Sequence, residues 1–146
     1  MKLSHASRYA VAALAYLARH KPAGLVASRT IATAEGLPER HLLKCIKPLV
    51  RSGVLRSQKG PYGGYALARA PKDVSLLDVV EAVDGPLLGR AEAVARHAAE
   101  FDARLQEVCE AAAELVRQRL AAVSIAALAE ELETQPGPTV AVKQPA

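Results

Sequence analysis

Apolar residues recur at helical spacing in four stretches of the first 83 residues. The spacing predicts helices over residues 4–19, 28–35, 38–52 and 75–83. Ser4 and Ser75 are suitable N-cap residues, Pro38 is favoured at a first helical position, and Gly36 permits a left-handed turn after the second helix. The second and third helices are therefore expected to form a helix-turn-helix.

Two short runs after the third helix, residues 54–58 and 65–68, are typical of β-strands. The loop Lys59–Gly64 that joins them contains three glycines and one proline, so its backbone can closely approach another surface. The loop matches neither the Walker spacing nor a GxGxxG motif that opens a helix. The pattern predicts a β-hairpin with a glycine-rich tip, which is a wing.

A third pattern begins near Leu88, where no Gly or Pro interrupts the chain between Gly89 and Ala122. We expect one long helix over residues 88–122 with an apolar stripe longer than its own domain can cover, which predicts dimerisation through this helix. The alternative is that the helix folds back onto its own domain. The predicted dimer-interface residues are Leu105, Val108, Cys109, Ala112, Leu115, Val116 and Leu120.

The predicted fold class is mainly α, a winged helix-turn-helix with a small two-stranded wing and a long C-terminal dimerisation helix. Residues 1–73 are predicted to be a DNA-binding domain, and residues 74–133 a linker helix with dimerisation helices, the last of them a short helix over residues 124–133. Residues 134–146 contain three prolines and little to bury, so they are expected to be a disordered tail.

Charge is distributed unevenly along the chain. Residues 1–73 hold 13 Lys or Arg against 3 Asp or Glu, whereas residues 74–146 hold 6 against 12. On the third helix four cations at positions i, i+4, i+7 and i+11 share one face, where they can reach guanine edges and phosphates in a major groove. The predicted DNA-binding residues are Arg40, Lys44, Lys47 and Arg51 on this helix, and Lys59, Gly60, Tyr62 and Gly63 in the wing.

Composition excludes several other classes of protein. A chain of 146 residues has room for one compact domain, and charged residues interrupt every apolar run that approaches the length of a membrane span, so we expect a cytoplasmic protein. Cys45 and Cys109 are too few and too far apart for a disulfide framework or a zinc site. His97 with Glu92, Glu100 or Asp102 is the one alternative for a metal site, and solvated helix surface is the preferred interpretation.

Residues 1–87 resemble the Rrf2 family of bacterial winged-helix transcriptional regulators, relatives of the iron–sulfur cluster regulator. The resemblance rests on the stretches Met1–Ser4, Arg8–Val11, Glu35–Leu37, Leu49–Leu55, Lys59–Ala68 and Val79–Leu87, and residues 124–129 resemble the family's final short helix. It implies a third helix in the major groove and a wing in the adjacent minor groove, where this chain has Lys59 instead of the usual Arg.

Members of that family that bind a cluster carry three cysteines between the fourth helix and the long helix, and residues 85–105 here contain none. We therefore expect no cofactor. Cys45 and Cys109 are interpreted as packed thiols. Pro48 is unusual inside a recognition helix because it removes the backbone hydrogen bond to the Lys44 carbonyl.

The sequence favours a homodimeric transcriptional regulator that binds double-stranded DNA at a pseudo-palindromic operator. A winged-helix module that binds an acidic protein is the alternative, and an enzyme is the weakest hypothesis because no nucleophile has a base at motif spacing. A small-molecule effector is possible but unidentified. The crevice between the fourth helix, residues 85–88 and the long helix is the predicted place for it.

Overall fold

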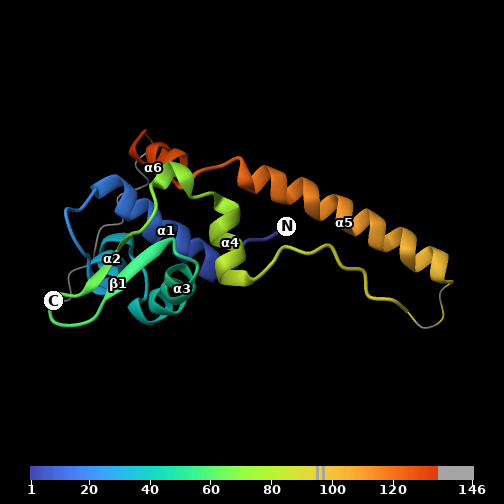
Figure 1. The fold of residues 1–146 in the computed structure, drawn as a ribbon, viewed down its shortest axis with the longest axis horizontal. Helices are drawn as coiled ribbons and strands as arrows, with labels where there is room; N and C mark the ends of the chain where they lie inside the picture. Colours follow the sequence, from blue (N-terminus) through green and yellow to red (C-terminus); the bar gives the residue numbers. More distant parts are fainter. Residues whose placement is uncertain (95, 97, 135–146) are drawn as a thin grey trace, which may run out of the picture.

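The computed structural model describes residues 1–94, 96 and 98–134, and it is mainly helical (Figure 1). Its helices are α1 (His5–His20), α2 (Ser28–Glu35), α3 (Glu39–Arg51), α4 (Leu76–Asp84), α5 (Ala99–Ala121) and α6 (Ile125–Thr134), with a 3₁₀ turn at Pro71–Asp73. The strands β1 (Leu55–Gln58) and β2 (Gly64–Leu67) form an antiparallel hairpin. This architecture confirms the predicted fold class.

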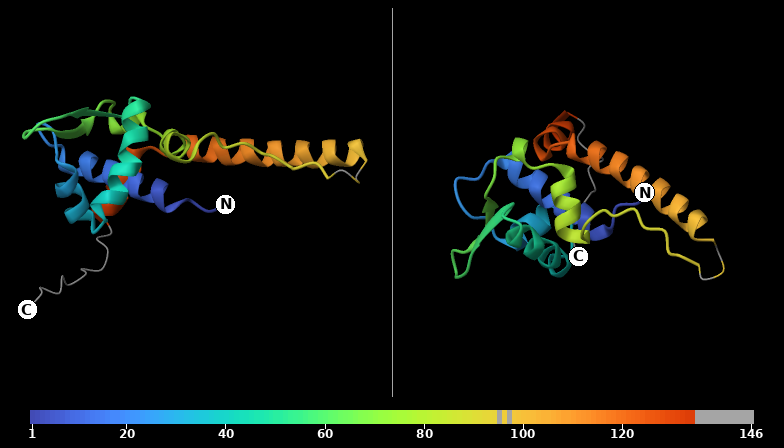
Figure 2. Two further views of the ribbon diagram at one scale, coloured as in Figure 1. Left: turned by 90° about the horizontal axis from the view of Figure 1, so that it is seen from below. Right: turned by 45° about the vertical axis from the view of Figure 1, so that its right-hand side comes forward.

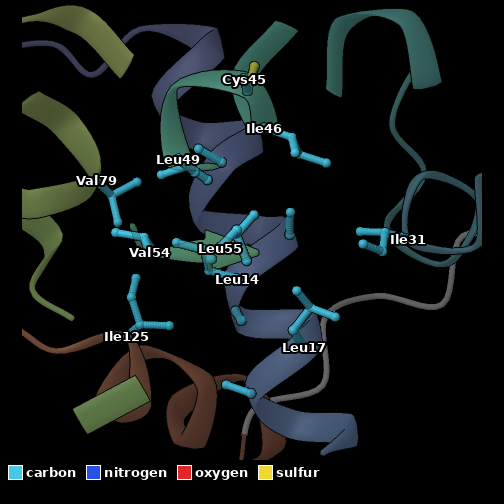
Figure 3. Packing of buried hydrophobic residues seen from close by; sticks show 14 of the residues in the cluster. Leu14, Leu17, Ile31, Cys45, Ile46, Leu49, Val54, Leu55, Val79 and Ile125 are labelled. Atoms are coloured by element: carbon cyan, nitrogen blue, oxygen red, sulfur yellow. The ribbon is translucent and has the colours of Figure 1, made fainter. Parts of the chain in front are cut away.

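Helix α1 lies at the centre of the core, and α3, α4 and α6 pack around it (Figure 3). Its N-terminus is capped by the Ser4 hydroxyl, which accepts a hydrogen bond of 2.9 Å from the Ser7 backbone N–H. Leu14 and Leu17 are almost fully buried, together with Ile31 from α2 and Leu42 and Leu49 from α3. A single apolar cluster thus holds the helix-turn-helix in place.

The turn between α2 and α3 forms as the sequence predicts. Gly36 has a φ of 65°, and the Leu37 N–H donates to the Ala32 carbonyl at 2.8 Å. Helix α3 begins one residue after Pro38 and continues through Pro48 to Arg51. The proline therefore does not end the recognition helix.

The hairpin is anchored at the start of β2, close to the wing tip, by a contact that the sequence pattern does not predict. Val26, in the segment before α2, forms two backbone hydrogen bonds with Tyr65 of β2, at 2.9 and 2.8 Å. A Cβ atom on Gly64 would lie 2.5 Å from the Val26 carbonyl oxygen, so only glycine fits beside this contact. The segment before α2 therefore holds the wing in place through the edge of β2 that does not pair with β1.

Helices α4 and α6 share the core with α1, although both lie in the second of the two parts predicted from sequence. Ser75 and Asp78 form a capping box at the start of α4, with both hydrogen bonds at 3.0 Å. Ser75 also pairs with Ser124, just before α6, and Ile125 is fully buried. The chain therefore returns to the N-terminal half after α5, where α6 packs against α1.

Asp84, the last residue of α4, binds the first turn of α1. The Ser4 and Ser7 hydroxyls each donate to one oxygen of its carboxylate, both at 2.7 Å, and Ser7 is fully buried. Gly85 follows with a φ of 88° and turns the chain away from α4. This cluster joins the start of the chain to the point where the α5 region departs.

The long helix is shorter than predicted. It starts at Ala99 rather than near Leu88, and residues 85–94 form no regular secondary structure (Figures 1 and 2). Instead they run beside α5: the Gln106 side chain donates to the Gly89 carbonyl and accepts from the Ala91 N–H, both at 2.9 Å. A Cβ atom on Gly89 would lie 2.0 Å from the Cys109 carbonyl oxygen. These contacts hold the segment extended.

Candidate nucleic-acid interface

Helix α3 separates its apolar and cationic residues onto opposite faces. Leu42, Cys45, Ile46 and Leu49 are buried in the core. The four cations that the sequence places on the other face are all exposed: Arg40, Lys44, Lys47 and Arg51. Burial of the apolar face fixes the helix to the domain, so the row of cations is presented to solvent along its length.

The first turn of α3 is held by Glu39. Its carboxylate accepts a hydrogen bond of 2.9 Å from the Ser28 hydroxyl and lies 3.5 Å from the Arg29 Nε, so it connects the starts of α2 and α3. After Glu39 the sequence contains no Asp or Glu until Asp73, whereas eight Lys or Arg lie between them. Residues 40–72, which run from the first turn of α3 through the wing, therefore form one continuous cationic stretch without an acidic residue.

The tip of the wing is a tight turn whose side chains point into solvent. Tyr62 is 93% exposed, and Lys59 and Gly60 are also exposed. The Gly63 N–H donates to the Gly60 carbonyl at 3.0 Å, and a Cβ on Gly63 would lie 2.2 Å from the Gln58 carbonyl oxygen. Gly63 thus shapes the turn, and Lys59 and Tyr62 are the side chains that it presents.

Two residues of the wing that the sequence pattern did not single out line a pocket shared with α3. Ser57 and Tyr65 face each other across β1 and β2, and with Lys47, Val50 and Arg51 they line a pocket of about 360 Å³. Ser57 lies two residues after the buried Leu55, and Tyr65 two residues before Leu67, so each shares a face of the hairpin with that leucine, and this period of two was the available signal. The pocket adds two hydroxyl groups to the cationic surface.

Cys45 is a core residue of α3. Burial raises the pKa of its thiol above the ordinary value, and the Asp84 carboxylate adds to this effect. The Sγ atom donates to the His41 carbonyl at 3.1 Å. The thiol is therefore protonated near neutral pH and packs as a small apolar group.

Comparison with known proteins assigns the chain to a family. A family model described as Rrf2, an iron-dependent transcriptional regulator, matches residues 3–131. The chain belongs to the Rrf2 family. An HTH-type transcriptional regulator of Mycobacterium tuberculosis is 36% identical over 87 residues, which cover 60% of this chain and 54% of that protein. CymR of Bacillus subtilis is 31% identical over 87 residues, covering 60% and 63% of the two chains.

Solved structures of Rrf2 regulators have the same fold. The structure of the cysteine regulator CymR of B. subtilis superimposes with a TM-score of 0.71 at 24% identity, covering 90% of this chain and 98% of that one. The T. potens IscR structure gives a TM-score of 0.68 at 26% identity, covering 94% and 93%. The winged-helix assignment thus holds over nearly all of the chain, whereas the curated relatives align over about half to three-fifths of their length.

The family description names iron, and the described residues of this Rrf2 chain do not fit an iron or iron–sulfur site. Within residues 1–94, 96 and 98–134, no three His, Cys, Asp or Glu side chains gather closely enough to hold a metal. Cys45 is a buried, protonated thiol, and Cys109 is a half-buried thiol on a different helix. His97, which the sequence offered as a metal ligand, lies outside the described residues.

Helix α5 of this Rrf2 chain has two distinct sides, and the predicted dimer-interface residues divide between them. Cys109, Val116 and Leu120 are half-buried within the chain, and the Cys109 backbone lies against Gly89. The other four residues are exposed: Leu105, Val108, Ala112 and Leu115. The second group therefore offers more surface to a partner than the first.

The crevice predicted for an effector contains a pocket. It has a volume of about 530 Å³ and lies between residues 87–90 and α5, with Gln106, Glu110 and Arg117 among the lining residues. Arg117 forms ion pairs with Glu81 of α4 and with Glu114, so charge on this surface is balanced.

Among the helices described, none is long and apolar enough to cross a membrane.

Proposed function

We propose that this Rrf2 protein is a sequence-specific DNA-binding regulator that acts as a homodimer on a pseudo-palindromic operator. The observation that carries the proposal is the row of exposed cations on α3, in a stretch of residues 40–72 that continues through the wing without an acidic residue, in a family described as a transcriptional regulator. Clustered Lys and Arg side chains on one face release counterions when they bind the phosphates of a duplex.

In this proposal α3 lies in the major groove and the wing contacts the neighbouring minor groove. Arg40 and Lys44, on the first half of α3, are exposed where an arginine or lysine can bond the O6 and N7 atoms of guanine. Lys59, at the base of the wing tip, reaches phosphates or a narrow minor groove. The matching residues of a second copy bind the other half-site.

The exposed side of α5 supports a dimer. Its apolar residues follow the 4-3-4-3 spacing of a coiled-coil seam: Phe101, Leu105, Val108, Ala112 and Leu115. Three of them, Leu105, Val108 and Leu115, are 42%, 52% and 68% exposed. An apolar stripe of this length costs free energy in water, and an identical helix from a second copy covers it with the same spacing.

Selection from a random-sequence duplex library tests the proposal, followed by titration of the recovered duplex at rising salt. We expect a slope of about −5 in a plot of log K against log salt if about six phosphates are neutralised. Arg40→Ala and Lys44→Ala should reduce the preference for the selected duplex over random DNA. Lys59→Ala should weaken binding to both duplexes. Arg104→Ala, on α5, is the matched control and should change neither.

Two results would contradict this function. Failure to bind any duplex at low salt would exclude a DNA-binding role. Equal competition by any polyanion, with no sequence recovered by selection, would instead favour a winged-helix module that binds an acidic protein.

A further inference from the structure

The pocket between α3 and the wing has the chemistry of an oxyanion site. It lies where the last two turns of α3 face the hairpin, two elements that pack against each other (Figures 1 and 2). Its lining consists of Lys47, Val50, Arg51, Ser57 and Tyr65. All four polar side chains can donate hydrogen bonds, and no carboxylate is among the lining residues.

None of these four donors is used by another side chain or a carbonyl group among residues 1–94, 96 and 98–134. Within the part of the chain that the structure describes, the side chains of Lys47, Arg51, Ser57 and Tyr65 have no hydrogen-bond or ion-pair partner. Other polar groups of the same domain are paired, as Arg19 is with Glu35 at 2.6 Å. The pocket therefore presents two hydroxyl donors beside two positive charges, all of them open to a ligand.

The two hydroxyl groups are held by rigid backbone. Ser57 and Tyr65 are directly opposite in the β1–β2 register, so their side chains project from the same face of the hairpin. The backbone of Tyr65 is also bonded on its other side to Val26, and its ring packs against the apolar core. A ligand in the pocket would meet donors that are already positioned, which lowers the entropic cost of binding.

We propose that this pocket binds one backbone phosphate of the DNA duplex, with Ser57 and Tyr65 donating hydrogen bonds and Lys47 and Arg51 supplying the charge. The proposal rests on the DNA-binding function above and assigns roles within it. Arg40 and Lys44 contact bases, whereas the second half of α3 and the wing clamp the phosphate and set the register of the helix along the groove. A free phosphate or sulfate ion offers the same oxygens and is the competing source.

Removal of single hydroxyl groups tests the clamp in the full chain. Ser57→Ala and Tyr65→Phe should each weaken binding about fivefold to tenfold, as expected for one hydrogen bond that is still partly exposed to solvent. The loss should be equal for the selected duplex and for a random duplex, since a phosphate contact carries no sequence information. Tyr9→Phe, which removes a phenol hydroxyl on α1, and Arg104→Ala, which removes an exposed cation on α5, should change affinity less than twofold.

A scan with methylphosphonate substitutions identifies the phosphate itself. Neutralising one phosphate at a time should reveal a position in each half-site where wild-type protein loses affinity and the Ser57→Ala/Tyr65→Phe double variant loses markedly less. If the wild-type protein binds DNA but the double variant binds equally well, or if no position shows this coupling, the phosphate clamp is wrong while DNA binding stands.

A last arm separates the two sources of phosphate. The free protein is titrated with inorganic phosphate up to about 10 mM, and binding is monitored through the amide chemical shifts of Ser57 and Tyr65. We expect no saturable site, because a single small anion gains less binding free energy than a duplex that is held by many other contacts. Saturable binding of the ion, combined with unchanged DNA affinity in the double variant, would assign the pocket to a free anion and overturn the proposal.

Discussion

Helices α3 and α5 both alternate apolar and charged residues, yet they relate to the rest of the molecule in opposite ways. Helix α3 buries four of its side chains in the domain core and exposes its cations. Helix α5 extends away from the other helices (Figure 1). None of its 23 residues is buried, and Phe101, Leu105, Val108 and Leu115 are exposed apolar side chains. One helix is stabilised by its own domain and presents a polar face to a ligand, whereas the other presents an apolar face.

This difference identifies the kind of partner that each helix needs. A cationic row on a rigid helix favours a polyanion and costs nothing when it is unbound, since water solvates it. An exposed apolar seam is unfavourable until another apolar surface covers it. The DNA-binding half is therefore expected to fold without a partner, and the α5 region is expected to gain most of its stability from dimerisation.

The largest expected difference between the two helices is in the free energy of unfolding when one leucine in each is shortened to alanine. Leu42→Ala in α3 removes a fully buried side chain and should lower the free energy of unfolding by about 3 kcal/mol. Leu115→Ala in α5 removes one that is 68% exposed and should cost the monomer less than about 0.5 kcal/mol. Urea denaturation at low protein concentration measures both. Equal losses would show that α5 packs on its own domain in solution.

A charge in the middle of the α5 seam should dissociate the dimer. Val108→Asp places a carboxylate near the midpoint of the helix, where the two copies would meet, and should weaken self-association about a hundredfold. Ala103→Asp introduces the same charge at an exposed position on another side of α5 and serves as the control. Sedimentation velocity over a concentration series distinguishes them. A dimer that tolerates Val108→Asp would place the interface elsewhere.

The two regions also differ in how far their structure follows from the sequence. Helix α2 has the predicted bounds, Ser28–Glu35, because caps and turn residues are local signals. The start of α5 was wrong by about ten residues, since the alanine-rich stretch after Gly89 has helical propensity but is held extended by Gln106 and the backbone at Cys109. Contacts between distant residues override propensity, and periodicity does not reveal them.

The candidate site shows the same limit. The cations of α3 follow from helical periodicity because they share one element, and the structure finds them exposed on one face. Ser57 and Tyr65 join them only through the packing of the hairpin against α3, which no local pattern encodes. The bridge from Val26 to Tyr65, which steadies that hairpin, links residues 39 positions apart and was also outside sequence reasoning.

Loss of the Asp84 carboxylate should have an intermediate effect at the junction between the two regions. Asp84→Ala leaves the buried Ser7 hydroxyl and the Ser4 hydroxyl without their acceptor and should destabilise the protein by about 1–2 kcal/mol. A double-mutant cycle with Ser7→Ala isolates the shared hydrogen bond, and Asp73→Ala, at an exposed position before α4, is the control. Additive losses in the cycle would mean that the hydroxyl and the carboxylate do not interact in solution.

The smallest effect concerns the two cysteines, one in each region. In a Cys109→Ser background only Cys45 remains, and its buried thiol should react with a thiol reagent no faster than the protein unfolds. Because burial and Asp84 raise the pKa of this thiol in the folded state, its contribution to stability is complete below the unfolded pKa and decreases as pH rises through it, from about pH 8.5 upward. The melting temperature should therefore fall more steeply between pH 7.5 and 9.5 in Cys109→Ser than in Cys45→Ala/Cys109→Ser. Parallel curves would show that the α3 core does not hold the thiol in its neutral form, and would weaken the contrast between a self-sufficient α3 and a partner-dependent α5.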